Sequence, residues 1–173
     1  MFPDPRRYLY SNLAAWGCGT GDVSGATAFG IPTPMSGMPQ QGSMTYTGFI
    51  EGTSTERYSS DGASYYAGID GTITLTFDSV TSKASVTIVP RLGLTAYHPL
   101  PPITGAELVW MRGATGFHQN VPGNPASLDY PLSGRFTGPQ GEELIGGLKL
   151  EYISPADGSR QVAGASFIAK RSI

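Results

Sequence analysis

Hydrophobic and polar residues alternate one by one along several short stretches of this sequence. Three such stretches lie close together, at 132–137, 148–152 and 163–167. A period of two residues is typical of a strand with one buried face. The segment 155–158, Pro-Ala-Asp-Gly, lies between the second and third stretches and has the chemistry of a tight turn. The pattern therefore predicts three strands in a meander near the C-terminus.

The same pattern continues toward the N-terminus. The run 72–89 contains no Gly or Pro, and ten of its eighteen residues are Thr, Val or Ile, which favours two strands around a turn at 78–83 over a helix. Residues 142–144 are expected to form a single helical turn at most. The other expected strands are 8–16, 27–31, 43–51 and 106–112, and the expected loops are 32–41, 53–64, 91–104 and 117–129.

The expected elements add up to an all-β fold. Consecutive strands joined by hairpins favour a single antiparallel up-and-down β-barrel of about eight strands, with residues 8–16 as its first strand. Closure of the sheet would remove its exposed edges. Residues 1–173 are expected to form one domain, in which 1–7 are disordered.

A barrel of about eight strands has an interior just wide enough to be filled by side chains. The aromatic residues that alternate onto one face are the expected filling: Tyr46, Phe77, Trp110, Phe136 and Phe167. In that case function lies on the loops or on the outer wall. Small residues at Gly48, Gly134, Ala163 and Ala165 keep an open interior with a bound ligand as an alternative.

Composition agrees with a turn-rich β-protein and excludes some functions. The 173 residues include 24 Gly and 14 Pro, and only 14% are charged, with a net charge of −2. A weakly acidic chain without a basic cluster lacks the electrostatic signature of nucleic-acid binding. No apolar run reaches the ~20 residues of a transmembrane helix.

Cys18 is the only cysteine, so no disulfide within the chain and no thiolate metal site is possible. A lipid-modified cysteine after a short signal peptide is disfavoured, because Ser11, Asn12 and Trp16 interrupt the apolar segment before it. We expect this chain to lack its export signal.

The motifs of common enzymes are missing. His98 and His118 are far apart in sequence, and neither has a cysteine or paired carboxylate at ligand spacing. Glu142 and Glu143 are adjacent and would point to opposite faces of a strand. The glycines between 19 and 25 are not followed by a helix that could hold phosphates. We therefore expect no catalytic residues, no metal, no cofactor and no enzymatic activity.

Aromatic and histidine side chains gather in two long loops. Tyr97 and His98 lie in 91–104, while Phe117 and His118 lie in 117–129. Tyrosine contributes large contact area at low entropic cost, so these four residues are the candidates for ligand binding. The alternative is that such residues only cap the ends of the barrel.

Four segments together resemble a known family. They are SGRFTGPQGEELIGGLKL (133–150), GASFIAKR (164–171), FGIPTPMSGMPQQGSMTYTGFIEG (29–52) and GIDGTITLTFDSVTSKASVTI (68–88). In this order they resemble the β-barrel domain of transferrin-binding protein B-like bacterial surface lipoproteins, over about 16–171.

The resemblance implies a non-enzymatic binding module at the bacterial outer-membrane surface, or in a secreted or periplasmic protein, that captures a host protein or a haem or other iron source. It gives Glu143 a structural role at the turn. Transferrin binding is not carried over, because the chain has no room for the family's handle domain. Two other readings remain open: a lipocalin-like carrier of haem or lipid, and a structural or export-recognition module.

Overall fold

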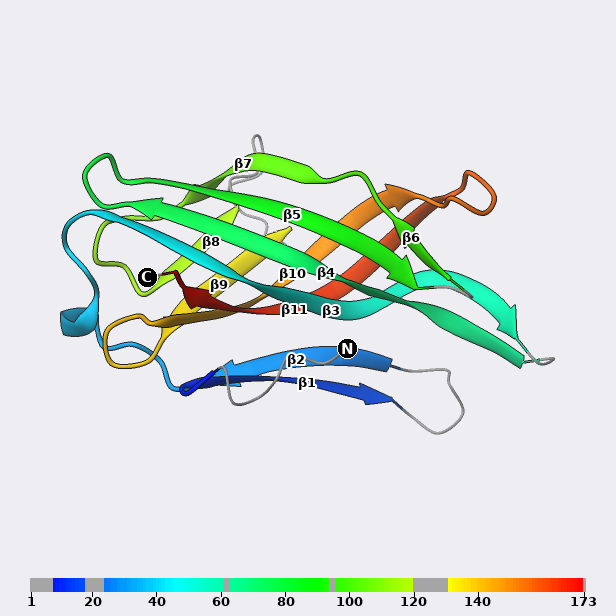
Figure 1. Cartoon of the computed structure of the whole chain (residues 1–173), viewed down its shortest axis with the longest axis horizontal. Helices are drawn as coiled ribbons and strands as arrows, with labels where there is room; N and C mark the ends of the chain where they lie inside the picture. The colour runs from blue at the N-terminus through cyan, green and yellow to red at the C-terminus, as the bar shows by residue number, and fades with distance from the viewer. Residues whose placement is uncertain (1–7, 18–23, 61–62, 94–95, 120–130, 173) are drawn as a thin grey trace, which may run out of the picture.

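The computed structural model describes residues 8–17, 24–60, 63–93, 96–119 and 131–172, and its regular structure is almost entirely β-strand (Figure 1). Its strands are β1 (Ser11–Gly17), β2 (Ser24–Gly30), β3 (Ser43–Ser60), β4 (Ala63–Asp78), β5 (Lys83–Gly93), β6 (Tyr97–Pro99), β7 (Ile103–Val109), β8 (Gly116–Gln119), β9 (Leu132–Thr137), β10 (Glu143–Ile153) and β11 (Arg160–Arg171), with one 3-10 turn at Met35–Gly37. The expected all-β class is confirmed. The expectations for residues 1–7 and Cys18 fall outside the described residues.

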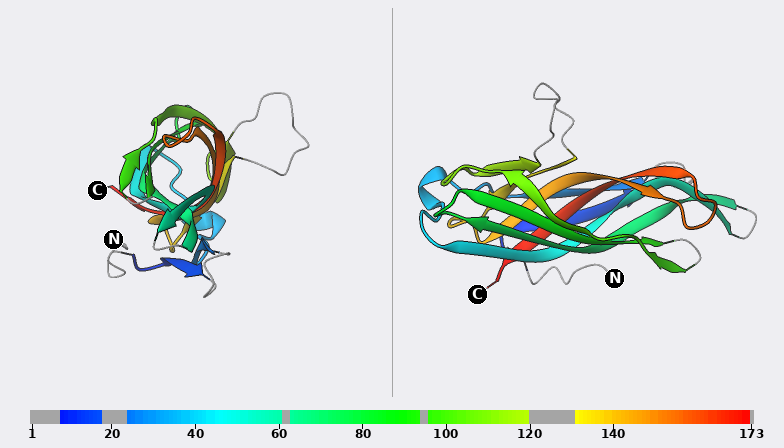
Figure 2. Two further views of the ribbon diagram at one scale, coloured as in Figure 1. Left: turned by 90° about the vertical axis from the view of Figure 1, so that its right-hand side faces the viewer. Right: turned by 90° about the horizontal axis from the view of Figure 1, so that it is seen from above.

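Nine strands form one antiparallel sheet in the order β4-β3-β11-β10-β9-β8-β7-β5-β6. Because β4 also pairs with β5, the pairing passes through eight strands and returns to its start. We call these eight strands (β3, β4, β5, β7, β8, β9, β10 and β11) the ring. Seen end on, they surround a common axis (Figure 2). The short strand β6 pairs with Arg91–Gly93 of β5, on the same edge of β5 that β7 joins at Ala84–Ile88.

The placement of the first strand was predicted wrongly. β1 pairs with β2 in a separate two-stranded sheet, and this hairpin lies against the outside of the ring (Figure 1). Hairpin residues contact mainly β11, β10 and β3. Alternation in 8–16 reports a strand with two different faces, but it carries no information about which sheet the strand joins.

Several expected loops are strand. β3 continues through 53–60, with a register shift between Thr53 and Arg57, and β10 begins at Glu143 where a helical turn was expected. The expected loops 91–104 and 117–129 contain β6 and part of β8. Pairing with a neighbouring strand satisfies backbone groups in these polar segments, which local composition does not reveal. The hairpin expected around 78–83 is confirmed by β4 and β5.

The interior of the ring is filled from alternate positions of every strand. All five aromatic residues expected there belong to one buried hydrophobic cluster, and four of them have no exposed surface: Tyr46, Phe77, Phe136 and Phe167, with Trp110 at 4%. On β10 the alternation is strict, since Leu148, Leu150 and Tyr152 are buried while Lys149 and Glu151 are exposed.

Candidate functional site

Aromatic rings fill one part of the interior. The centroid of the Phe77 aromatic side chain lies 4.9 Å from that of Phe136, 5.0 Å from Phe117, 5.3 Å from Trp110 and 5.9 Å from Tyr46. Most of these pairs meet edge to face, which is the favoured geometry of aromatic contacts. This packing occupies the space in which a ligand of an open carrier would lie.

The glycines of the inner face mark close packing. Gly134 and Gly146 lie opposite each other on β9 and β10, between Phe117 and Phe167 on the flanking strands. A Cβ at Gly134 would lie 2.6 Å from Cζ of Phe117, and one at Gly146 would lie 2.4 Å from Cζ of Phe167. The aromatic side chains of Phe117 and Phe167 therefore cover the two glycines. At Gly48 a Cβ would meet the backbone of β11.

The two small alanines belong to the same packing. Ala163 and Ala165 are both buried members of the hydrophobic cluster. Together with the glycines, they show that the small inner residues make room for neighbouring side chains, which argues against the carrier alternative.

The interior becomes polar toward the end that holds the β10–β11 turn. Glu56 is buried and accepts hydrogen bonds from Tyr152 Oη at 3.0 Å and from Ser154 Oγ at 2.8 Å. Ser54 also hydrogen-bonds to Tyr152 and accepts the Glu56 N–H at 3.0 Å. A buried carboxylate needs such donors, because burial without them is very costly. The cluster lies at the register shift of β3 against β4, between Thr53 and Arg57.

Burial of two tyrosines predicts a loss of stability in alkali. Burial raises the pKa of Tyr46, and burial together with the Glu56 carboxylate raises the pKa of Tyr152 to about 12, against a partly opposing Ser54 hydrogen bond. Their contribution is complete below the unfolded-state pKa of about 10 and is lost as pH rises toward the folded values. Urea unfolding between pH 9 and 12 should show midpoints that fall above pH 10. A slope equally steep in Tyr46→Phe would contradict the role of Tyr46.

The four candidate binding residues do not form one site. Tyr97 is exposed on β6, whereas His98 lies on the opposite face of that strand, beside the buried Leu92 of β5. Phe117 is buried in the aromatic cluster and His118 is half-buried on β8. His98 pairs next to Leu92, while Gln119 connects through Leu108 to Ala84. Leu92 and Ala84 are eight positions apart on β5, which at 3.3 Å per residue places the β6 candidates about 26 Å from the β8 candidates.

The structure instead builds a patch around Tyr97 at one end of the ring. The guanidinium carbon of Arg91 lies 4.9 Å from the ring centroid of Tyr97, and that of Arg57 lies 4.4 Å from the centroid of Tyr66. Arg91 also contacts Asp70 at 2.9 Å. The register places Arg57, Tyr66, Arg91 and Tyr97 on the same outer face of β3, β4, β5 and β6. We call these four residues the tyrosine–arginine patch.

Sequence reasoning found only part of this patch. Tyr97 was chosen, but Arg57 and Tyr66 were assigned to or beside a polar loop, 53–64. The tyrosines 58, 65 and 66 were visible in the sequence as a group. Their pairing across a hairpin, Arg57 with Tyr66 and Tyr58 with Tyr65, required the extension of β3 and β4 that polar composition concealed.

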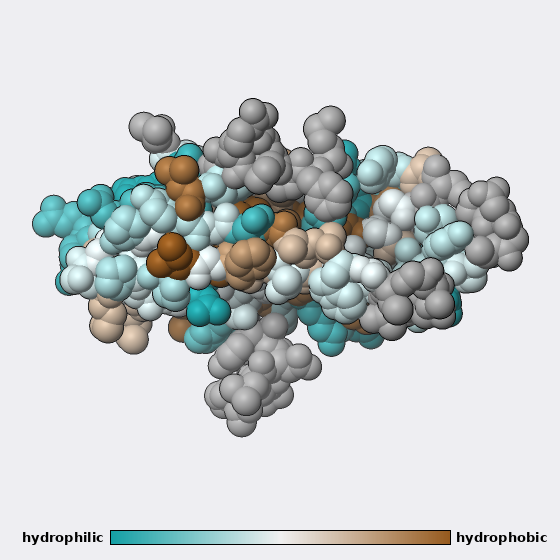
Figure 3. All heavy atoms as spheres, turned by 90° about the horizontal axis from the view of Figure 1, so that it is seen from below, coloured by the Kyte–Doolittle hydropathy of each residue, from teal (hydrophilic) through white to brown (hydrophobic). Residues whose placement is uncertain are grey.

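A second surface feature lies where the β1–β2 hairpin meets the ring. Ile145 and Ile168 point outward from β10 and β11, and the hairpin buries them to 3% and 1% exposure. Glu143 accepts the N–H groups of Leu9 at 2.6 Å and Tyr10 at 3.1 Å, which ties the start of the hairpin to β10. Figure 3 views this side, where apolar surface gathers in the central part between more polar ends.

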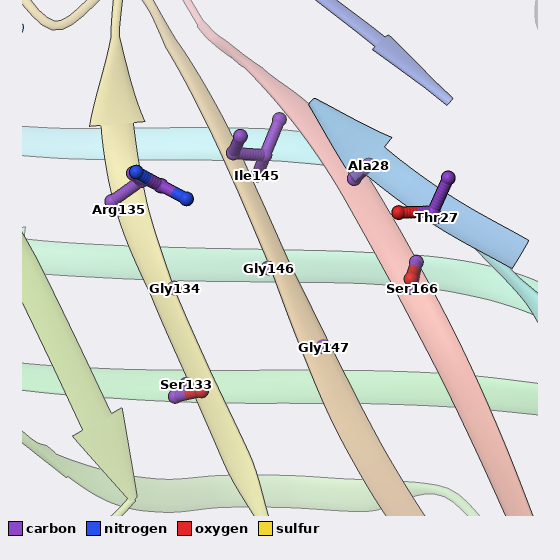
Figure 4. Close-up of a pocket in the computed structure, with 9 residues that line it drawn as sticks. All are labelled: Thr27, Ala28, Ser133, Gly134, Arg135, Ile145, Gly146, Gly147 and Ser166. Carbon is purple, nitrogen blue, oxygen red and sulfur yellow. The ribbon is translucent and has the colours of Figure 1, made fainter. Parts of the chain in front are cut away.

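Beside the hairpin is an open groove of about 380 Å³ (Figure 4). Its lining comes from β2, β9, β10 and β11: Thr27, Ala28, Ser133, Gly134, Arg135, Ile145, Gly146, Gly147 and Ser166. Among the described residues no group of three or more His, Cys, Asp or Glu side chains could hold a metal ion. Across the residues that the structure describes, no helix is long and apolar enough to cross a membrane.

Comparison with solved structures identifies the fold. Transferrin Binding Protein B from Haemophilus parasuis Hp5, a vaccine antigen solved as a mutant, superposes with a TM-score of 0.60 at 19% identity over 96% of this chain and 34% of that chain. The chain has a transferrin-binding protein B-like barrel-domain fold.

Two other transferrin-binding protein B (TbpB) structures give the same result. Isotype 1 TbpB from serogroup B Neisseria meningitidis has a TM-score of 0.55 at 17% identity, over 96% of this chain and 33% of that one. Intact Ap-TbpB, with N and C lobes, has a TM-score of 0.52 at 17% identity, over 95% and 34%. The chain thus spans about a third of these TbpB chains. No protein-family model and no curated protein matches the sequence.

Proposed function

We propose that the chain is a non-enzymatic protein-binding module of a bacterial surface or secreted protein. In this proposal residues 1–173 are one domain and the ring acts as a closed eight-stranded barrel, a rigid scaffold that presents the tyrosine–arginine patch. The observation that carries the proposal is this patch, with two cation–π pairs on one outer face above a filled interior. Tyrosine and arginine are enriched among the residues that dominate protein–protein binding energy.

The TbpB neighbours support a binding role by their names, and the surface location is proposed on the same likeness. Transferrin is one bait to test, because the neighbours are named for binding it. It is not the only bait, because this chain spans only about a third of those proteins. The carrier of haem or lipid is less favoured, since aromatic rings occupy the interior around Phe77. An export-recognition role has no specific feature of the described residues in its favour.

Immobilised protein should capture a partner from host serum, and the double variant Arg91→Ala/Tyr97→Ala should bind it at least tenfold more weakly. Truncation of residues that dominate an interface costs 2 kcal/mol or more, and each 1.4 kcal/mol is a factor of ten. Purified transferrin and haem are measured separately. Capture is followed by mass spectrometry and then by surface plasmon resonance with the purified partner.

The control is Met111→Ala, which removes an exposed apolar side chain after β7, near the end of the ring where Lys83 begins β5. Its affinity should stay within twofold of the unchanged protein. Both variants should melt within a few degrees of the unchanged protein, because exposed ion pairs contribute about 0–1 kcal/mol. Equal binding by the double variant and the unchanged protein would remove the patch from the proposal.

A further inference from the structure

The unpaired edge of β2 borders the groove on the outer wall. β2 pairs only with β1 in the described structure, and Thr27 and Ala28 line the groove while no β1 residue does. Figure 4 shows β2 crossing above β11, with the groove extending from it across β10 to Arg135 on β9. An exposed strand edge is a ready template for another strand.

The backbone of β2 is oriented for such pairing. The carbonyl of Ala26 accepts the Ser166 hydroxyl of β11 at 2.9 Å, so it points away from β1. The Ile31 N–H, in contrast, donates to the Tyr10 carbonyl across the hairpin at 2.9 Å. Since the direction alternates along an antiparallel strand, Ala28 also directs its N–H and C=O away from β1. Within the described residues, neither of these two groups of Ala28 has a hydrogen-bond partner.

The floor of the groove is low because small residues form a row across three strands. Ser133 of β9 lies opposite Gly147 of β10, which lies opposite Ser166 of β11. A Cβ at Gly147 would have only one atom nearby, the Ala165 carbonyl oxygen at 3.7 Å, so the space above this glycine is open. With a volume of about 380 Å³ the groove is within the range of ligand sites, about 300–1,000 Å³. The space beside β2 can therefore accommodate the backbone of an extended peptide segment.

The charge at the far wall selects the occupant. Arg135 is exposed and lines the groove, and the described residues place no carboxylate within ion-pair distance of it. Lys149, two residues after Gly147 on the same outer face of β10, lies 4.0 Å from the Glu151 carboxylate and does not line the groove. The Arg135 guanidinium beside an unpaired strand edge favours an acidic side chain on the incoming segment, because arginine binds carboxylates through charge-assisted, often paired hydrogen bonds.

We propose that this groove binds an extended acidic segment of a partner protein, which adds to the hairpin as a third strand beside β2 and places a carboxylate against Arg135. Main-chain bonds to Ala28 provide affinity and the Arg135 contact provides selectivity, as in other cases of strand addition. The site uses none of the four residues of the tyrosine–arginine patch, so either site can fail without the other.

The test uses two blocked hexapeptides as probes, Thr-Val-Glu-Val-Thr-Val and the same sequence with Lys in place of Glu. They are titrated into 15N-labelled protein while amide spectra are recorded. The Glu peptide should shift the amides of Ala28 and Gly147, and its Kd should be at least tenfold lower than that of the Lys peptide. Arg135→Gln should weaken binding of the Glu peptide at least tenfold.

Two further variants address the strand geometry. Ala28→Pro removes the edge N–H, a change that edge strands tolerate, and should abolish binding. Gly147→Leu should fill the floor of the groove and also abolish binding of the Glu peptide. The control is Gly68→Leu, at an exposed glycine of β4 with no atom near its Cβ, which should bind the peptide like the unchanged protein.

Failure of the Glu peptide to bind overturns the proposal, as does binding that survives both Ala28→Pro and Gly147→Leu. Light scattering at increasing protein concentration provides the other decisive arm. A dimer that disappears in Ala28→Pro would assign the edge to a second copy of this chain and would also overturn the proposal.

Discussion

Phe136→Ala is expected to lower the free energy of unfolding by about 3–5 kcal/mol, the usual cost of truncating a fully buried phenylalanine. Phe136 has no exposed surface, and its ring lies between 4.9 and 6.4 Å from the rings of Tyr46, Phe77, Trp110 and Phe117. Its removal leaves a cavity lined by large rings that cannot move inward without leaving their own partners. Urea unfolding followed by tryptophan fluorescence measures the change.

Phe29→Ala is the matched control for that experiment, because Phe29 is 54% exposed on the hairpin. Its effect should stay below about 1 kcal/mol, as is usual for surface substitutions. Phe167→Ala, which uncovers Gly146, should resemble Phe136→Ala. A loss below about 1 kcal/mol for Phe136→Ala would mean that the interior repacks or is looser than the observed ring contacts require.

Glu143→Ala is expected to cost about 3 kcal/mol and to free the hairpin from the ring. The Glu143 carboxylate is 1% exposed and accepts two backbone N–H groups, from Leu9 and Tyr10. A hydrogen bond to a charged group contributes about 1.5–3 kcal/mol, and its loss leaves the donors without a partner. Hydrogen exchange should become faster across β1 and β2, while the amides of β4 and β5 keep their protection.

Glu142→Ala separates this effect from a general loss of charge at the turn. The neighbouring carboxylate accepts the N–H of Gln140 at 2.9 Å in an exposed position. Its removal should cost less than about 1 kcal/mol and leave exchange in the hairpin unchanged. Equal exchange rates in the two variants would show that Glu143 does not hold the hairpin.

Part of the candidate site could be read from the sequence and part could not. Tyr97 lies in a proline-flanked segment and was chosen because tyrosine suits recognition surfaces. Its partner Arg91 became visible only through the pairing of β5 with β6, which brings the two side chains onto one face. Phe117 was misjudged, because its strand is only four residues long and is bounded by polar and glycine positions.

Glu143 illustrates the same limit at a longer range. The sequence identifies an acidic pair at a turn, and the family resemblance implies a structural role. The partners of Glu143 are more than 130 residues away, at Leu9 and Tyr10. Local chemistry cannot specify such a contact, since any buried carboxylate near unpaired N–H groups would satisfy the same requirement.

The sequence alone determined the all-β class, the hairpin around 78–83, the turn at 155–158 with Gly158 at a φ of 75°, and the inward positions of Tyr46, Phe77 and Phe136. These features depend on neighbours two to four residues apart, where periodicity and turn chemistry act directly. Only the tertiary structure decided that β11 closes the ring by pairing with β3, that the first hairpin lies outside the ring, and that β2 keeps an unpaired edge beside the groove. The reason is that an alternating strand can join either edge of any sheet. The choice depends on which distant surfaces, here Ile145 and Ile168, remain to be covered once the interior is full.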